Sequence, residues 1–361
     1  MRLLQQQSAD AVKEFTQLAS KYPRVPSVHY NLAIAHLLNR DLAKAIASLN
    51  EAVRLEPDYT DAVMLLSELN LRKGDASASI ATLRQLLQRQ SNNVPAHLLM
   101  ANAYLARQMP DEALGVYRRL ASMMPTNPQP PFLMGRVLRS QGKIQEARQA
   151  FERAADLVPN DLVLLEQLVD LDLSERKYDS ALKRVTEAIN KDPKGVGPQL
   201  ILAVVHLAQG MTNQAESVLR KVIELDPNAR PAHLMLAQIA LQSNRRDQAL
   251  QQLETLLAKN PKDVTALLQV AAIHESSGDY RAAASWYEKV LAVSTNSPVA
   301  MNNLAYLYSE RLGQLDKAQE LAQRARDLRP NDPSVADTLG WILFKRGEYG
   351  KAMQLVKESA E

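Results

Sequence analysis

The sequence contains no cysteine, few aromatic residues and no long apolar run. The lack of cysteine excludes disulfides, thiolate nucleophiles and metal sites built on sulfur. The most apolar segment, residues 200–208, is too short to cross a bilayer and contains a histidine. Residues 1–15 hold no apolar core long enough for a signal peptide. The sequence therefore predicts no direct insertion into a membrane.

The chain also has no large excess of positive or negative charge. The 43 basic and 40 acidic residues leave a formal net charge of +3, with the two signs interspersed. This balance provides no strong electrostatic field for nucleic acid, so we expect no nucleic-acid partner. The chain has no GxSxG elbow, no glycine-rich phosphate loop and no HExxH motif. We therefore expect no enzyme activity and no cofactor.

What the chain does have is a repeat. A proline recurs at multiples of 34 residues through most of the sequence, and an insertion displaces the last one by one residue: Pro23, Pro57, Pro125, Pro159, Pro193, Pro227, Pro261 and Pro330. When this proline is numbered position 32, position 20 is alanine in every repeat except at Ser79. Position 8 is small except at Val169, and position 24 is usually large, as at Phe151.

These positions predict two antiparallel helices per repeat. Small residues at positions 8 and 20 let the two backbones approach, and the large residue at position 24 fills the space beside them. Glycines near position 15 provide a left-handed C-cap, and the proline stops the second helix. One helix pair cannot bury its apolar face alone, so the pairs are expected to stack into a solenoid.

The pattern resembles the tetratricopeptide repeat (TPR) family over the whole chain. The resemblance implies an all-α fold, a right-handed superhelical α-solenoid of about ten helix-turn-helix units. We expect a single solenoid over residues 1–361, with a partial unit at 1–25 and repeats at 26–59, 60–93, 94–127, 128–161, 162–195, 196–229, 230–263, 264–297, 298–332 and 333–361. The repeat 60–93, with Ser79, Leu86 and Ser91, departs most from the pattern, and local irregularity is expected there.

The six histidines fall at two positions of this register. His29, His97 and His233 lie at position 4, and His36, His206 and His274 lie at position 11, where TPR units prefer aromatic rings. A metal site needs convergent ligands with a carboxylate or a third histidine, and none is evident. We therefore interpret the histidines as packing residues and expect no metal.

Two pairs of opposite charge stand out in consecutive repeats. Arg136 and Arg139 lie in one first helix, and Glu166 and Asp170 lie in the next. Adjacent first helices lie side by side in a stacked solenoid, so an ion network between repeats explains them most simply. A polar ligand site is the alternative that the residues leave open.

The TPR resemblance implies a concave groove lined by the first helices. A peptide or a helix of a protein partner would bind there. The predicted partner-binding residues are Tyr30, Asn31, Asn102, Arg136, Arg139, Glu166, Asp170, Gln238, Asn302, Asn303, Tyr306, Asp337 and Trp341. The function implied is a non-catalytic interaction scaffold. A self-assembling structural module, with homo-oligomers, and a regulatory TPR arm of a larger enzyme are the alternatives.

Residues 302–352 are similar to the closing repeats of bacterial cell-envelope TPR proteins linked to exopolysaccharide export and PEP-CTERM systems. This similarity implies a role in a bacterial envelope assembly or secretion system, and a periplasmic or envelope-associated location rather than a cytoplasmic one. The last helix carries apolar residues at packing spacing, among them Met353 and Val356. Because solenoids usually end in a polar cap, we expect the sequence to be a fragment of a longer repeat protein.

Overall fold

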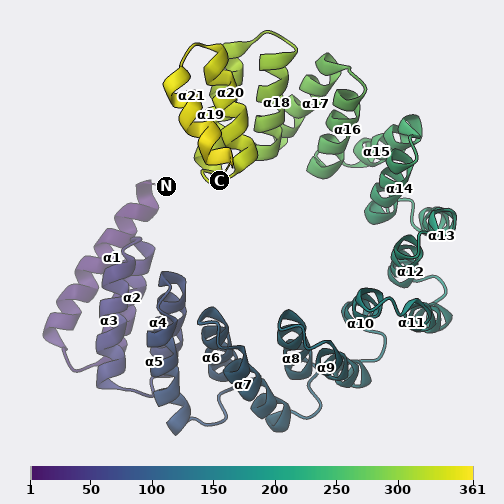
Figure 1. The fold of residues 1–361 in the computed structure, drawn as a ribbon. Helices are drawn as coiled ribbons and strands as arrows, with labels where there is room; N and C mark the ends of the chain where they lie inside the picture. Colours follow the sequence, from purple (N-terminus) through teal and green to yellow (C-terminus); the bar gives the residue numbers. More distant parts are fainter. Residues whose placement is uncertain (1, 361) are drawn as a thin grey trace. The chain divides into compact units, whose positions relative to one another are not determined.

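The structure is a computed structural model that describes residues 2–360, with side chains from residue 7 to residue 359. Met1 and Glu361, the outer limits of the predicted solenoid, lie outside the described residues. Every regular element in the described range is an α-helix, and there are 21 of them (Figure 1). The predicted all-α fold is confirmed.

The helices divide into two compact bodies, one ending at Glu175 and one beginning at Arg176. The N-terminal body contains α1 (Arg2–Lys21), α2 (Pro26–Leu38), α3 (Leu42–Leu55), α4 (Thr60–Lys73), α5 (Ala76–Arg89), α6 (Val94–Ala106), α7 (Pro110–Met123), α8 (Gln129–Ser140), α9 (Ile144–Leu157) and α10 (Leu162–Ser174). The C-terminal body contains α11 (Tyr178–Lys191), α12 (Val196–Ala208), α13 (Thr212–Leu225), α14 (Arg230–Gln242), α15 (Arg246–Lys259), α16 (Val264–Ser276), α17 (Tyr280–Val293), α18 (Pro298–Glu310), α19 (Leu315–Leu328), α20 (Pro333–Lys345) and α21 (Tyr349–Ala360). The boundary falls inside the predicted repeat 162–195.

Within each body the helices stack in chain order. The even-numbered helices are the first helices of the repeats, and each packs on the odd-numbered second helix before it. The first helices α4 and α6, and likewise α18 and α20, are also in direct contact. Stacked helix pairs of this kind confirm the predicted α-solenoid of TPR type.

Short polar side chains fix the starts of several helices. The carboxylates of Asp41, Asp161 and Asp263 accept the backbone N–H three residues later, at 2.9–3.1 Å. Such N-caps satisfy a donor that the first helical turn leaves without an intrahelical partner. Asp161 and Asp263 lie two residues after a repeat proline and begin the first helices α10 and α16, whereas Asp41 begins the second helix α3.

The turn inside each repeat adopts the left-handed conformation. The predicted glycine C-caps are confirmed, since φ is positive at Gly74, Gly142, Gly210, Gly278 and Gly347. Other repeats make the same turn without glycine, with φ of 57–60° at Arg40, Gln108, Arg176 and Asn244. The register therefore determines this conformation even where the residue disfavours it.

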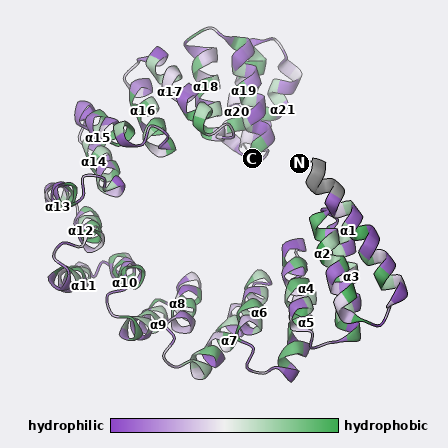
Figure 2. Cartoon of the chain, turned by 180° about the vertical axis from the view of Figure 1, so that it is seen from behind, coloured by the Kyte–Doolittle hydropathy of each residue, from purple (hydrophilic) through white to green (hydrophobic). Residues whose placement is uncertain are grey.

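The core follows the predicted distribution of small and large residues. Ala147 at position 20 and Phe151 at position 24 are fully buried. A Cβ placed on Gly135, at position 8, would lie 2.6 Å from two carbons of the Phe151 ring. The glycine thus makes room for the ring between α8 and α9. Figure 2 shows the resulting mixture of apolar and polar residues around each helix.

The irregularity expected in the repeat 60–93 is not found, and that prediction was wrong. Helices α4 and α5 are unbroken, and Ser79 and Leu86 are fully buried. Serine is small enough to replace alanine at position 20, so the helices still approach.

Candidate partner-binding face

The predicted partner-binding residues all lie on first helices. We call the surface formed by the first helices of one body its first-helix face. In the N-terminal body these residues are Tyr30 and Asn31 on α2, Asn102 on α6, Arg136 and Arg139 on α8, and Glu166 and Asp170 on α10. In the C-terminal body they are Gln238 on α14, Asn302, Asn303 and Tyr306 on α18, and Asp337 and Trp341 on α20. Tyr30, Asn302 and Asn303 are half-buried, and the other predicted residues are exposed.

The charged residues on α8 and α10 come together only in part. The Arg139 guanidinium forms an ion pair with Asp170 and donates a hydrogen bond to Gln167 Oε1 at 3.0 Å. This pair confirms a contact between repeats. Arg136 instead lies near Tyr117, where burial raises the pKa of the phenol and the guanidinium partly offsets the shift. Arg136 and Glu166 therefore remain available on the first-helix face.

A cavity on the first-helix face of the C-terminal body lies between α18 and α20. We call it the α18–α20 recess, and its volume is about 230 Å³. Its walls are Tyr306, Glu310, Asp337, Thr338 and Trp341. Tyr306, Asp337 and Trp341 are predicted partner-binding residues, so the structure brings these three together.

Glu310 organises one wall of the recess. Its Oε1 accepts hydrogen bonds from Trp341 Nε1 at 2.7 Å and Ser309 Oγ at 3.0 Å, and it pairs with Lys345 Nζ at 2.6 Å. Burial alone would raise the pKa of the Glu310 carboxyl, but the bonds from Lys345, Trp341 and Ser309 hold it below its usual range. Glu310 is therefore ionised at neutral pH and fixes the orientation of the indole ring.

An aromatic row continues from the recess toward α21. The Trp341 ring stacks on Phe344 with centroids 5.5 Å apart, and Phe344 meets Tyr349 edge-on at 5.5 Å. All three rings remain substantially exposed, with Trp341 at 45%. Large rings are normally covered in a folded protein, so this row is a contiguous apolar surface that water contacts.

A partly buried chain of hydrogen bonds begins at Asn303 on α18. Asn303 Nδ2 donates to the Tyr287 hydroxyl at 3.0 Å, and that hydroxyl donates to Glu275 Oε2 at 2.8 Å. Burial is the main cause that raises the pKa of Tyr287. Asn303 therefore links α18 to α16 and α17, and its amide is partly used inside the protein.

A second recess, in the N-terminal body, was not predicted from the sequence. It lies between α8 and α10, has a volume of about 280 Å³ and is mainly apolar, with Phe132, Val158, Val163 and Leu164 among its lining residues. Phe132 and Val163 lie at first-helix positions, and this placement is the signal that could have pointed to it.

Another cavity, of about 410 Å³, opens between α5, α6 and α7, with Arg84, His97 and Gly115 in its lining. The sequence signal for it is weak. It consists of a glycine inside α7 whose missing side chain leaves open space.

The histidines at position 4 have a role beyond packing. The Nε2 atoms of His29, His97 and His233 lie 2.9–3.2 Å from the carbonyl oxygen six residues earlier, at position 32 of the preceding repeat. Gln199, at the same position, donates to Pro193 in the same way at 3.0 Å. Because the carbonyl can only accept, Nε2 carries the proton. The repeat register predicts the position of these side chains but not this hydrogen bond.

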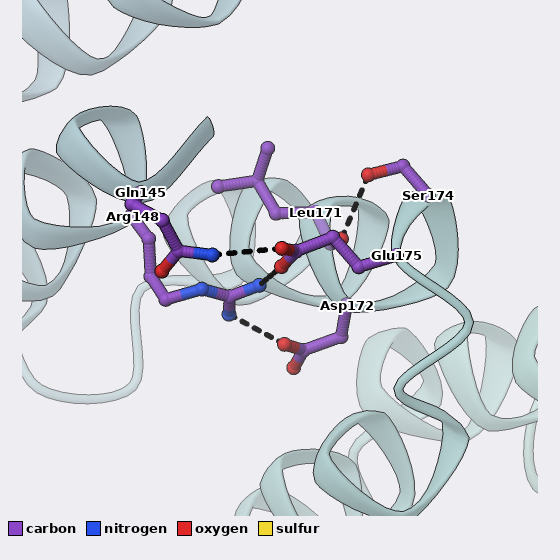
Figure 3. A network of polar contacts seen from close by, with 6 residues as sticks. All are labelled: Gln145, Arg148, Leu171, Asp172, Ser174 and Glu175. Carbon is purple, nitrogen blue, oxygen red and sulfur yellow. Dashed lines mark hydrogen bonds and ion pairs between the residues drawn. The ribbon is translucent and has the colours of Figure 1, made fainter. Parts of the chain in front are cut away.

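A buried ion cluster joins α9 to α10 (Figure 3). Arg148 forms an ion pair with Asp172, which is 0% exposed, and its Nη2 donates to Glu175 Oε2 at 2.5 Å. Gln145 Nε2 donates to Glu175 Oε1 at 2.7 Å. Burial alone would lower the pKa of Arg148, but its bonds to Glu175 and Asp172 raise it. Asp172 occupies position 11, where five other repeats place a ring, and the role of the cluster is structural.

Across residues 2–360, no group of three or more histidine, aspartate or glutamate side chains is arranged to hold a metal ion. No helix in the same range has both the length and the apolar character needed to span a membrane.

Stacked helix pairs with a face of aromatic and polar side chains define an α-helical repeat scaffold. Sequence profiles of the tetratricopeptide repeat match residues 3–60, 36–103, 70–130, 104–171, 172–232, 206–272 and 276–342. The chain therefore belongs to the tetratricopeptide repeat family. Such proteins are generally non-catalytic scaffolds that typically mediate protein–protein interactions.

Individual relatives are distant. The TPR repeat-containing protein PA4667 of Pseudomonas aeruginosa is 29% identical over 72 residues, which are 20% of this chain and 12% of that protein. Yeast Tom70 aligns over 98% of this chain and 88% of its own, with a TM-score of 0.55 and 15% identity. The structure of Naa15/Naa10 bound to HypK-THB aligns over 98% of this chain and 61% of its own, with a TM-score of 0.50 and 15% identity. These two similarities support the fold alone.

Proposed function

We propose that the protein is an interaction scaffold whose first-helix face binds a segment of a protein partner, extended or helical. The observation that carries this proposal is the α18–α20 recess, where Tyr306 and Trp341 are exposed beside a cavity. Asn31 and Asn102 in one body and Gln238 in the other offer further polar contacts on the first helices.

The recess has the properties of a binding centre. Tyrosine and tryptophan are enriched among the residues that contribute most to binding energy. The bond from Trp341 to Glu310 holds the indole ring in place before a partner arrives, so less side-chain entropy is lost on binding. The row Trp341, Phe344 and Tyr349 extends the apolar surface beyond the recess.

The recess between α8 and α10 supports the same proposal for the N-terminal body. Its apolar lining suits an aliphatic or aromatic side chain of a bound segment. Arg136, Glu166 and the Arg139–Asp170 pair lie on the same two helices and would provide a polar surround.

Selection of a displayed library of random 12-residue peptides tests the proposal. Peptides enriched on the wild-type chain should bind at least about tenfold more weakly to Trp341→Ala and Tyr306→Ala, since losing a dominant aromatic anchor costs about 2 kcal/mol or more. Calorimetry on purified peptides measures the affinity.

The matched control is Tyr22→Ala. Tyr22 is a tyrosine about as exposed as Tyr306, but it follows α1 in the other body. This variant should bind like the wild type. Equal affinity for the wild type and both recess variants would contradict the proposal, as would the absence of any enriched peptide.

We also propose that the scaffold works in a bacterial envelope assembly or secretion system, such as one for exopolysaccharide export. The similarity of residues 302–352 to closing repeats of envelope TPR proteins supports this proposal. Fractionation of cells that express the whole gene product should recover it with the periplasm or the membranes. Recovery in the cytosol alone would refute it.

A further inference from the structure

The α18–α20 recess is rich in hydrogen-bond acceptors and poor in donors. The Trp341 N–H is used by Glu310 Oε1, and the Thr338 hydroxyl donates to the Ser334 carbonyl oxygen at 3.0 Å. The atoms that remain are the Asp337 carboxylate, the Glu310 Oε2 atom and the Thr338 oxygen, all acceptors. The Tyr306 hydroxyl can donate or accept. A group that fits this recess brings its own donors.

The charges near the recess leave one carboxylate free. Lys345 pairs with Glu310, and Arg346 pairs with Asp316. Arg311 lies over the Tyr280 ring at 4.8 Å, and Lys317 lies over the Tyr308 ring at 5.5 Å. Asp337 is exposed and has no ion-pair or hydrogen-bond partner among the described residues. The recess therefore presents an unneutralised negative charge.

The aromatic walls of the recess also favour a positively charged ligand. The faces of tyrosine and tryptophan rings carry negative electrostatic potential and attract cations. Trp341 already has Lys345 Nζ at 5.9 Å from its ring centroid. A planar guanidinium can stack on such rings while its five N–H groups reach the surrounding acceptors.

We propose that the α18–α20 recess binds an arginine side chain of the partner segment, with the Asp337 carboxylate as its ion-pair partner and the Tyr306 and Trp341 rings as its walls. This inference rests on the proposed function and specifies the chemistry of one subsite. The cavity of about 230 Å³ suits one long side chain. An apolar side chain would leave Asp337 and Glu310 facing it without new partners, and an acidic one would be repelled.

Capped pentapeptides of the form Ala-Ala-X-Ala-Ala test the assignment, with X as arginine, norleucine or glutamate. The chain has two tryptophans, so its NMR spectrum contains two indole N–H signals, and Trp341→Phe identifies the one that belongs to Trp341. Titration of each peptide into the full chain is followed at this signal. The arginine peptide should bind at least about tenfold more tightly than the other two, because only its guanidinium can form charge-assisted hydrogen bonds with the Asp337 carboxylate.

Asp337→Asn keeps the shape of the recess and removes its free charge. This variant should bind the arginine peptide about tenfold more weakly than the wild type does, with an affinity no higher than that for the norleucine peptide. Asp247→Asn, an exposed aspartate on α15, is the matched control and should leave all three affinities unchanged.

Three results would overturn the assignment: equal binding of arginine and norleucine, preference for glutamate, or no movement of the Trp341 signal with any peptide. None of these results contradicts partner binding as such, because the library selection with Trp341→Ala and Tyr306→Ala decides that separately. Loss of peptide selection in that experiment, in turn, would remove the basis for both proposals.

Discussion

Replacing Arg148 with methionine is expected to lower the free energy of unfolding of the N-terminal body by about 3–5 kcal/mol, the usual cost of breaking a buried ion pair. Asp172 is 0% exposed and Arg148 only 12%, so the substitution removes charge-assisted bonds that lie largely out of contact with water. The methionine side chain is an unbranched chain like that of arginine, so the loss of stability reports the missing charge rather than a missing volume.

The matched control is Arg139→Met, which breaks an arginine–aspartate pair between α8 and α10. The side chains of Arg139 and Asp170 are 40% and 51% exposed, and exposed ion pairs contribute at most about 1 kcal/mol to stability. Denaturant unfolding followed by circular dichroism measures both variants. Hydrogen exchange in α9 and α10 localises the effect, because repeat proteins can open locally. Similar losses for the two variants would show that the Arg148 cluster is not effectively buried.

Phe151→Ala is expected to cost about 3–5 kcal/mol, the range found when a fully buried aromatic side chain is removed from a core. The ring is fully buried, packs 5.9 Å from the Phe132 centroid and fills the space over Gly135. Its removal leaves a cavity between α8 and α9 that alanine cannot fill.

Phe344→Ala is the matched control, because it removes a phenylalanine ring that is exposed rather than buried. Phe344 is half-exposed on α20, and removal of an exposed ring should cost about 1 kcal/mol or less. Melting and denaturant unfolding of both variants provide the comparison. A loss at Phe344 that matches the loss at Phe151 would contradict the assignment of positions 8, 20 and 24 as the core contact.

The fold was predictable because its signal is repeated in the sequence. Small residues at positions 8 and 20 and a large one at position 24 specify one helix contact many times over, as the Gly135–Phe151 contact illustrates. The left-handed turns at Arg40 and Gln108 show the limit of local reasoning. Their residue types do not favour that conformation, and only their place in the register predicts it.

Side-chain networks were predicted less well. The Arg139–Asp170 pair follows from the placement of opposite charges on neighbouring first helices, and it is confirmed. The Arg148–Asp172 pair was missed, although an aspartate at position 11, where rings are preferred, was a usable signal. The bond from Trp341 to Glu310 depends on two rotamers, which no spacing rule determines.

The central claim is that the first helices form the partner-binding face. Hydrogen exchange of the chain with and without a selected peptide tests it most directly. The account predicts slower exchange in α18 and α20 when peptide is bound, with α17 and α19 unchanged. Protection confined to the second helices α17 and α19 would contradict it.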